Sequence, residues 1–315
     1  MSEMEKAMAR QPAELERLFR DQGPVVKAAE RIRGRRTFLV GTGTSWHAAN
    51  QGAEMLRLAG MEARAVEAID AALYGPRPQS GDALILLSHR GTKRYTSDVL
   101  NRARADGVAT IVIGGIGAPG ADLETVEQER SSAFTISHLG ALARLATLAT
   151  ALDADLGDLA AVPEAVARTL ASREPSITPP RRGLEFIGAG INRWTAAEGA
   201  LKIRETARVF ASAHSVEQFF HGPSVAMDAR DTLIVLEAGG PAAQRLADVA
   251  RAAEQSGTSV HRITHHALPE TLSIFPLTAA VQRIALEAAI AVGSDSDAFG
   301  FDVPGRKAAW QPIKL

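Results

Sequence analysis

The chain has 315 residues and a mass of 33.3 kDa, which at about 150 residues per domain predicts two domains. Its 46% content of hydrophobic residues is enough for two packed cores and excludes a disordered or fibrous protein. The 35 basic and 36 acidic residues leave a net charge of −1, which excludes the broad basic surface of a general nucleic-acid-binding protein. The absence of cysteine excludes disulfides, thiolate metal sites and cysteine nucleophiles.

The amino-terminal segment MSEMEKAMARQ predicts the start of a helix over about residues 3–20 and lacks the apolar centre of a signal peptide. Since no run of about 18 apolar residues is free of charge, we also expect no membrane span. The chain is therefore expected to be soluble and cytoplasmic, without a membrane or nucleic-acid partner.

The sequence then repeats itself. The segment RTFLVGTG (36–43) recurs as GLEFIGAG (183–190), DALILLS (82–88) as DTLIVLE (231–237), and GVATIVI (107–113) as GTSVHRI (257–263). The offset between partners drifts only from 147 to 150 residues. Each half alternates short apolar runs with longer segments of helical period, which is typical of a parallel sheet covered by helices on both faces. We expect an α/β protein built from two copies of one domain.

Domain limits follow from this repeat. The first domain is expected over residues 1–160, with a last long helix at 137–152, and the second over 161–315. The proline-rich segment EPSITPPRRG (174–183) predicts the linker or its end. The tail from residue 295 has no equivalent in the first half, and such a tail either wraps back to complete a site or is only a docking strap.

Two loops of the first half follow apolar strands, where open parallel sheets bind ligands. In GTGTSWHAA (41–49), Gly43 allows close approach to a ligand, and Thr44 and Ser45 offer hydroxyls and can cap the following helix. Trp46 replaces the third glycine of the dinucleotide fingerprint, which disfavours NAD, and no cofactor is expected.

The second loop, SHRGTKRYTSD (88–98), combines hydroxyls with cations around a glycine. Taken alone, it is typical either of a solvated basic turn or of a binding site for a phosphate monoester at a helix amino terminus. The equivalent loop of the second half, EAGGPAA, has no cation, so one anion site is expected. The residues of this loop expected in the site are Ser88, His89, Arg90, Gly91 and Lys93.

The second half instead carries a helix over 194–210. Its Glu198, Lys202 and Glu205 lie on one stripe at i, i+4 and i+7, and this spacing alone is typical of an exposed salt-bridge ladder. Further along, His221 stands in the turn FFHGP, where a histidine is by itself typical of a structural loop.

Taken together, these segments resemble a known family. MEKAMARQPAEL, GTSWHAA, the S-x-x-G loop at 88–91, EGALKIRE and HGP resemble the tandem sugar isomerase (SIS) family. The resemblance is greatest to the isomerase half of glucosamine-6-phosphate synthase and its stand-alone deaminase, isomerase and deglycase relatives. It extends over nearly the whole chain and implies two tandem SIS domains, each a parallel sheet between helices, with a carboxyl-terminal tail.

The resemblance also implies roles for single residues. The two loops of the first half would surround the sugar phosphate. Glu205 would move a proton between C1 and C2 with Lys202 beside it, and His221 would open the sugar ring from the neighbouring subunit of a homodimer. A tail lysine of the synthase forms an imine with the ketose, and Lys307 is its candidate here.

Elementary chemistry agrees with these roles. Aldose–ketose interconversion needs a carboxylate that takes and returns a proton, and a group that titrates near neutrality. An imine-forming lysine must be deprotonated, which burial under a folded tail would favour. The family's Ser-Gln-Ser-Gly-Glu-Thr loop reads Ser-His-Arg-Gly-Thr-Lys at 88–93, so two hydroxyl donors are replaced by cations. The sequence therefore predicts the type of reaction but not which sugar phosphate is the substrate.

The expected function is a phosphosugar aldose–ketose isomerase, or a deaminase or deglycase of an amino sugar phosphate. The alternative is a catalytically silent sugar-phosphate sensor. Glutaminase activity is not expected, because in the family it depends on a cysteine. No metal site is expected either, since His265 and His266 are adjacent, no HExxH motif occurs and DSDAFGFD lacks the ligands of a calcium loop.

Overall fold

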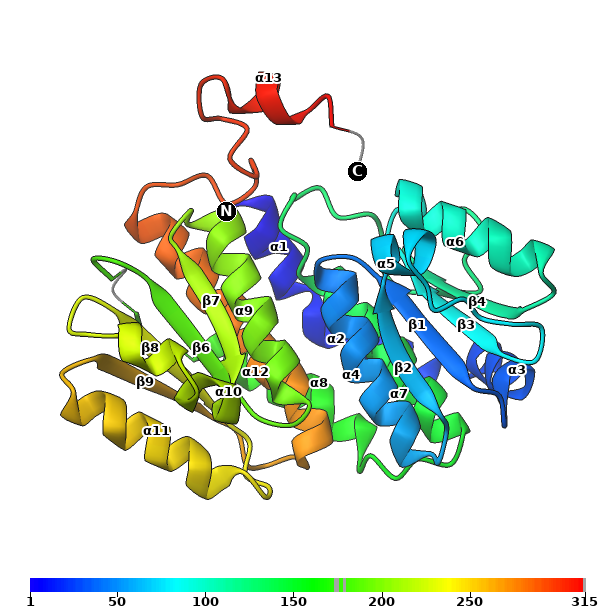
Figure 1. Ribbon diagram of the computed structural model, residues 1–315, viewed down its shortest axis with the longest axis horizontal. Coiled ribbons are helices and arrows are strands. Elements are labelled where there is room, and N and C mark those ends of the chain that lie inside the picture. Colours follow the sequence, from blue (N-terminus) through cyan, green and yellow to red (C-terminus); the bar gives the residue numbers. More distant parts are fainter. Residues whose placement is uncertain (173–175, 178–179, 314–315) are drawn as a thin grey trace. The chain divides into compact units, whose positions relative to one another are not determined.

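The computed structural model describes residues 1–172, 176–177 and 180–313 (Figure 1). It divides into two compact units. The N-unit comprises Arg10–Glu129, Ile136–Pro163 and the chain from Pro312, and the C-unit comprises Met1–Ala9, Arg130–Thr135 and Glu164–Gln311. The expected linker at 174–183 falls partly outside the described residues.

The N-unit contains a parallel sheet with the strand order β2-β1-β3-β4-β5. Its central strands are buried along their whole length, as expected for a parallel sheet with helices on both faces. The expected apolar runs therefore form its central strands. The strands are β1 (Thr37–Gly41), β2 (Ala63–Glu67), β3 (Ala83–Leu87), β4 (Ala109–Gly114) and β5 (Leu123–Glu124).

Helices cover the two faces of this sheet. Side chains that alternate along β1 separate the faces: Phe38 and Val40 pack with α5 and α6, whereas Leu39 faces α4 and α7. The long helix α7 is buried nearly all round because α2, α3 and α4 also pack on it. The helices are α2 (Gln11–Arg20), α3 (Gly23–Ile32), α4 (Thr44–Leu58), α5 (Ala68–Leu73), α6 (Arg94–Ala105), α7 (Ile136–Ala151) and the short 3₁₀ helix η1 (Leu159–Ala161).

The single helix expected over residues 3–20 is interrupted. The first part, α1 (Glu3–Ala9), ends before Arg10, and α2 has Pro12 in its first turn. A proline ring crowds the preceding turn and its nitrogen cannot donate a hydrogen bond, so the first helix cannot continue into the second. The two parts also belong to different units.

The C-unit contains a parallel sheet with the strand order β7-β6-β8-β9, which repeats the order of the first four strands of the N-unit. Its strands are β6 (Leu184–Gly188), β7 (Ala211–Ser215), β8 (Thr232–Glu237) and β9 (Ser259–Thr264). Its further helices are α8 (Val162–Ala171), which starts at the boundary of the units, α9 (Asn192–Thr206), α10 (Val216–Phe220), η2 (Pro223–Ala226), α11 (Ala243–Gln255), α12 (Glu270–Ala291) and α13 (Arg306–Trp310).

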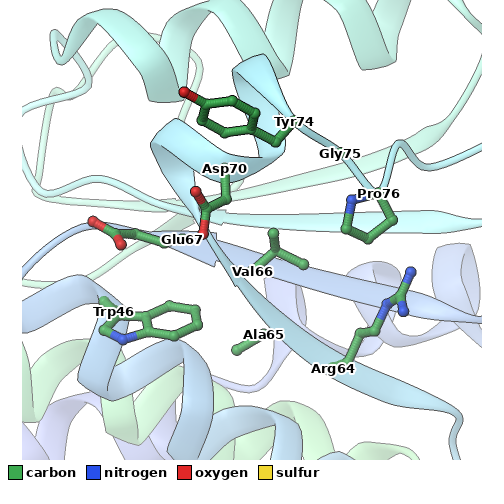
Figure 2. A pocket seen from close by; sticks show the side chains of 9 residues that line it. All are labelled: Trp46, Arg64, Ala65, Val66, Glu67, Asp70, Tyr74, Gly75 and Pro76. Carbon is green, nitrogen blue, oxygen red and sulfur yellow. The ribbon is translucent and has the colours of Figure 1, made fainter.

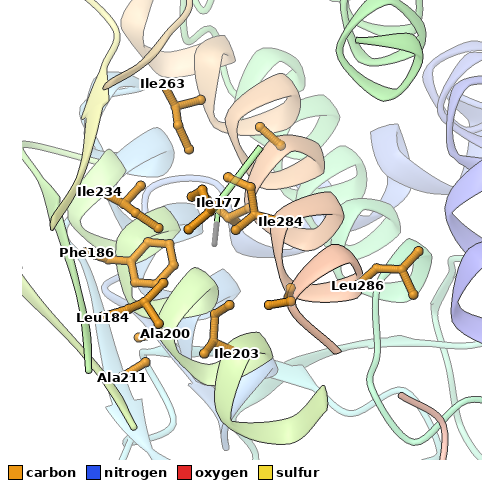
Figure 3. Close-up of a cluster of buried hydrophobic side chains, with 14 of the residues drawn as sticks. Ile177, Leu184, Phe186, Ala200, Ile203, Ala211, Ile234, Ile263, Ile284 and Leu286 are labelled. Atoms are coloured by element: carbon orange, nitrogen blue, oxygen red, sulfur yellow. The ribbon is translucent and has the colours of Figure 1, made fainter. Parts of the chain in front are cut away.

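The core of the C-unit lies between the sheet and the helices α9 and α12 (Figure 3). Phe186 and Ile234 come from the strands, and Ile203 and Ile284 from the two helices. Met4 of α1 is buried in the same cluster. The carboxylate of Asp297 accepts the backbone N–H of Met4 at 2.9 Å, so the beginning of the tail holds the first helix of the chain in place.

Helix α12 is long and apolar enough to cross a membrane by length and composition, and it is the only such helix among the described residues. In the structure, 83% of its apolar window is buried inside the protein. This burial is what a core helix between sheet and neighbouring helices shows.

Both units bring a helix unusually close to the end of a strand. A Cβ added to Gly41, the last residue of β1, would lie 2.5 Å from the backbone oxygen of Ser45 in α4. A Cβ added to Gly188, the last residue of β6, would lie 2.2 Å from the backbone oxygen of Asn192 in α9. Only glycine fits these positions, so the turn that starts each helix depends on them.

We predict that Gly41→Ala lowers the free energy of unfolding by about 1–3 kcal/mol, because the added methyl group forces α4 away from β1. Urea denaturation at constant m value measures the loss. Gly81→Ala is the matched control, since a Cβ there has open space within 4 Å and ordinary backbone angles. Equal midpoints for the two variants would contradict the steric argument.

Candidate active site

The turn between β1 and α4 presents the start of a helix to solvent. Gly43 has a φ of 58° and open space around its Cα, which lets another molecule approach the backbone. Its carbonyl accepts the N–H of Trp46 at 2.8 Å, which closes the first turn. Thr44 and Ser45 are half-buried in that turn. The local geometry therefore suits an anion at the positive end of the α4 dipole.

The loop from β3 to α6 has the same design with cations added. Ser88 is buried, and its N–H continues the sheet by donating to Ile113 O at 3.0 Å. Gly91 has a φ of 68° and packs against Pro119, so the loop turns sharply there. Arg90 and Lys93 are exposed on this turn, directly before α6 begins.

His89 is directed into the protein rather than toward an anion. Its carbonyl accepts hydrogen bonds from Gly115 N (2.9 Å) and Gln128 Nε2 (3.0 Å), and its ring Nε2 accepts the N–H of Glu129 (3.3 Å). Burial, followed by the charge of Arg90, lowers the pKa of His89 to about 4. His89 is thus neutral at pH 7 and ties the loop down, and its expected part in the phosphate site stays a prediction.

Arg90 and Lys93 supply the positive charge of the loop. The pKa of Lys93 is lowered, first by loss of hydration and second by the charge of Arg90. The side chain of Lys93 is nevertheless exposed, so the loss of hydration is partial. The second cause means that the two cations repel one another. An anion between them would relieve this repulsion.

A cleft of about 440 Å³ opens beside the first turn of α4 (Figure 2). Trp46 lines it together with the carboxylates Glu67 and Asp70 and the exposed ring of Tyr74. Aromatic faces can stack on the apolar side of a sugar ring, and carboxylates accept hydrogen bonds from hydroxyls. We did not predict Glu67, Asp70 or Tyr74 from the sequence. The available signal was the repeat, since Tyr-Gly-Pro at 74–76 precedes His-Gly-Pro at 221–223 by 147 residues.

In the C-unit, α9 buries the three charged residues of its stripe. Glu198 and Lys202 are fully buried, and the side chain of Glu205 is only 13% exposed. The Lys202 ammonium lies 3.4 Å from Glu198 Oε1 and donates a short hydrogen bond to Glu205 Oε2. The exposed ladder indicated by the spacing alone is therefore wrong, because this side of α9 faces the protein interior.

The charge state of Lys202 follows from these contacts. Burial alone would lower its pKa, but Glu198 and Glu205 outweigh burial and hold the pKa above its usual value. Lys202 therefore stays protonated and cannot form an imine or act as a base at neutral pH. Its positive charge favours the carboxylate form of Glu205, which is the form that can accept a proton.

His221 lies at the other end of the sheet of the C-unit. Glu205 is on the last turn of α9, before β7 begins, whereas His221 ends α10, which follows β7 directly. The five residues of β7 span roughly 16 Å at 3.3 Å per residue. His221 is 70% exposed and contacts Glu217 at 3.1 Å. Glu205 thus precedes the amino end of β7, and His221 follows its carboxyl end.

Lys307 is on α13, in the exposed tail. The tail starts near the end of α9, where Arg208 pairs with Asp302 at 2.6 Å and the Ser294 hydroxyl donates to Thr206 O at 2.6 Å. The side chain of Lys307 is not covered, so the expected burial under a folded tail is not present in this structure. Among the described residues, no group of three or more acidic or histidine side chains could hold a metal ion.

Solved structures with a similar fold cover nearly the whole chain. The C-terminal domain of glucosamine-fructose-6-phosphate aminotransferase from Francisella tularensis superposes with a TM-score of 0.80, at 17% identity, over 94% of this chain and 98% of that one. A second match is glucosamine-6-phosphate deaminase from Thermotoga maritima, with a TM-score of 0.80 and 20% identity over 94% of this chain and 97% of that one. A third is tagatose-6-phosphate ketose/aldose isomerase from Escherichia coli, with a TM-score of 0.80 and 17% identity over 94% of this chain and 95% of that one. The chain has a phosphosugar isomerase-like α/β fold.

Residues 32–117 match the family model described as SIS domain. The chain therefore contains a SIS domain, which lies within the N-unit. The glutamine–fructose-6-phosphate aminotransferase (isomerizing) of Aeropyrum pernix is 26% identical over 250 residues, which are 70% of this chain and 40% of the relative. The protein of the same name from Gloeobacter violaceus is 25% identical over 232 residues, which are 65% of this chain and 38% of that relative. The chain spans about two fifths of the length of these relatives.

We predict that Lys202→Met destabilises the protein by about 3–5 kcal/mol, because it leaves Glu198 buried without its cation. Urea denaturation measures the change. Lys6→Met removes the lysine of an exposed pair with Glu3, and as the control it should change stability by less than about 0.5 kcal/mol. A Lys202 variant as stable as the control would show that the buried charges do not depend on one another.

Proposed function

We propose that the chain is a phosphosugar enzyme made of two tandem SIS domains, which interconverts an aldose and a ketose phosphate or removes the amino group of an amino sugar phosphate. The observation that carries this proposal is the buried contact between the Lys202 ammonium and the Glu205 carboxylate on α9. A carboxylate kept charged and ordered, and still partly open to solvent, is what proton transfer between adjacent carbons needs.

Duplication is part of the proposal. The two sheets share the strand order of their first four strands, and their first turns share a pair of glycines with offset 147: Gly41 with Gly188, and Gly43 with Gly190. Gly43 and Gly190 also share a positive φ, 58° and 50°. These features support two copies of one domain that have since specialised.

The N-unit would hold the phosphate group. Thr44 and Ser45 start α4, and Ser88, Arg90 and Lys93 precede α6, so each loop offers hydroxyls or cations at a helix amino terminus. Gly43 of the first loop leaves room for the anion next to the backbone. In this assignment His89 positions the loop and does not contact the phosphate.

The C-unit would carry out the proton transfer. In the proposed reaction Glu205 takes the proton from one carbon of the open-chain sugar and returns it to the neighbouring carbon, through an enediol or enamine. Lys202 stays protonated and holds the Glu205 carboxylate in place. Lys307 would reach the substrate only when the tail closes, and it would form the imine of a ketose there.

His221 would act from a second copy of the chain, as a residue that assists opening of the sugar ring. The strand β7 stands between it and Glu205 in the C-unit, which supports a histidine supplied by a second chain. His221 and the nearby Val225, which is 88% exposed, are available to a partner. We therefore propose a homodimer.

We predict that the double variant Arg90→Ala/Lys93→Ala weakens binding of a hexose 6-phosphate more than about tenfold, because two charge-assisted contacts are lost. Isothermal titration calorimetry measures the affinity. The control Lys27→Ala/Arg104→Ala removes the same charge from exposed positions of the N-unit and should bind normally. Unchanged affinity in the first variant would move the phosphate site elsewhere.

We predict that Glu205→Gln lowers turnover about 10²–10⁴-fold, because the amide cannot accept the proton. The assay incubates the protein with hexose and hexosamine phosphates, with and without ammonium, and follows products by NMR. Conversion of at least one sugar is expected for the unaltered chain. Tight binding without any product would instead identify a sugar-phosphate sensor.

The same assay tests the homodimer. His221→Ala is expected to be inactive alone, as is Glu205→Gln. After the two variants are mixed and reassembled, about a quarter of the activity should return, because half of the dimers are mixed and each mixed dimer has one complete site. Mixing Glu205→Gln with Glu205→Ala is the control and should restore nothing. No recovery in the first mixture would place both residues in the same chain's site or exclude His221.

A further inference from the structure

The C-unit retains the backbone of the anion-binding loops of the N-unit. Gly190 before α9 corresponds to Gly43 before α4, and Gly240 before α11 corresponds to Gly91 before α6, at offsets of 147 and 149. Gly91 and Gly240 both have a positive φ, 68° and 78°. The paired loops differ in length by only one residue, since the loop from β6 to α9 is one residue longer than that from β1 to α4 and the loop from β8 to α11 is one residue shorter than that from β3 to α6. The C-unit therefore has a corresponding cradle of two loops at two helix amino termini.

The side chains of this second cradle have lost their positive charge. At the offset of 149, the positions of Arg90 and Lys93 are taken by Gly239 and Ala242. No lysine or arginine occurs in the loop from 237 to 243. By composition alone, the second cradle would bind no anion.

An anion nevertheless occupies it. The carboxylate of Glu270, the first residue of α12, lies between the two loops. A Cβ added to Gly240 would meet Glu270 Oε2 at 2.4 Å, and one added to Gly190 would meet Glu270 Oε1 at 3.0 Å. The two oxygens of one carboxylate thus contact the two glycines that correspond to those of the N-unit.

The rest of the first turn of α12 fixes Glu270 in this place. The Ser273 hydroxyl donates to Glu270 O at 2.7 Å and accepts a hydrogen bond from Asn192 Nδ2 at 2.9 Å. Asn192 and Ser273 are buried, so the start of α9 and the start of α12 are joined next to the cradle. Backbone groups at helix amino termini stabilise a negative charge, whether it belongs to a ligand or to the protein.

We propose that the C-unit contains a second, latent site for a phosphate group, which the Glu270 carboxylate fills as an internal anion. Glu270 occupies the place that the phosphate of a sugar phosphate takes in the proposed function of the N-unit, on which the comparison rests. The chain therefore binds one phosphate rather than two. Removing the carboxylate opens the second site.

The test uses the full chain carrying Arg90→Ala/Lys93→Ala, in which the proposed N-unit site is weakened, and inorganic phosphate as the probe. Addition of Glu270→Ala should create one phosphate site per chain, with affinity at least about tenfold above that of the background, as measured by ³¹P NMR and calorimetry. Glu270→Gln keeps the volume of the side chain and should not create the site. Glu254→Ala, on the exposed side of α11, removes an equal charge and should also have no effect.

Two results would overturn the proposal: a folded Glu270→Ala variant without added phosphate binding, or equal gains for Glu270→Ala and Glu254→Ala. Circular dichroism establishes that each variant is folded. If the background itself still binds one phosphate, the N-unit assignment is wrong, and the proposal then requires that Glu270→Ala raise the stoichiometry to two. The failures of the two assignments are thus distinguishable.

Discussion

The buried ammonium of Lys202 is the constraint on which the candidate site depends. A lysine without access to water is stable only when carboxylates compensate it, and Glu198 and Glu205 do so from the same helix. Removing either carboxylate would leave a buried charge unbalanced. The three side chains therefore depend on one another, and α9 must keep the orientation that buries them. Helix α9 reaches this depth because Gly199 packs directly on Phe186, where a Cβ would come within 2.7 Å of the ring.

This arrangement separates two demands that conflict in a single residue. A proton-transferring carboxylate must be accessible to substrate, whereas a group that fixes its charge works best when water is excluded. Glu205 meets the first demand at the end of α9, and Lys202 meets the second one turn earlier. The loop proposed to bind the phosphate in the N-unit differs, since its cations Arg90 and Lys93 stay exposed and the neutral His89 is half-buried.

The sequence predicted the strands, turns and helices that carry these residues, because apolar runs followed by glycine turns determine them locally. It did not predict which helix faces are buried. An i, i+4, i+7 ladder has the same spacing on a surface and in a core, and the burial of Glu198 is decided by packing against distant elements. The inward ring of His89 likewise depends on Gly115 and Gln128, and Glu270 reaches its cradle from 80 residues along the chain from Gly190. Such long-range contacts have no local signature.

The position of His221 turns assembly into a condition for the proposed reaction. Glu205 precedes β7 and His221 follows it, and β7 is a hydrogen-bonded edge strand of the parallel sheet, so its length is fixed. We propose a second chain as the source of the histidine that one sugar would need, because β7 stands between Glu205 and His221 within one chain. The exposed Glu217, which pairs with both His221 and Arg245, has its pKa lowered by these contacts and remains charged. A charged Glu217 holds the imidazole of His221 in one orientation within a single chain. In the proposed homodimer, the reaction would then require only that the second chain bring this imidazole to the sugar.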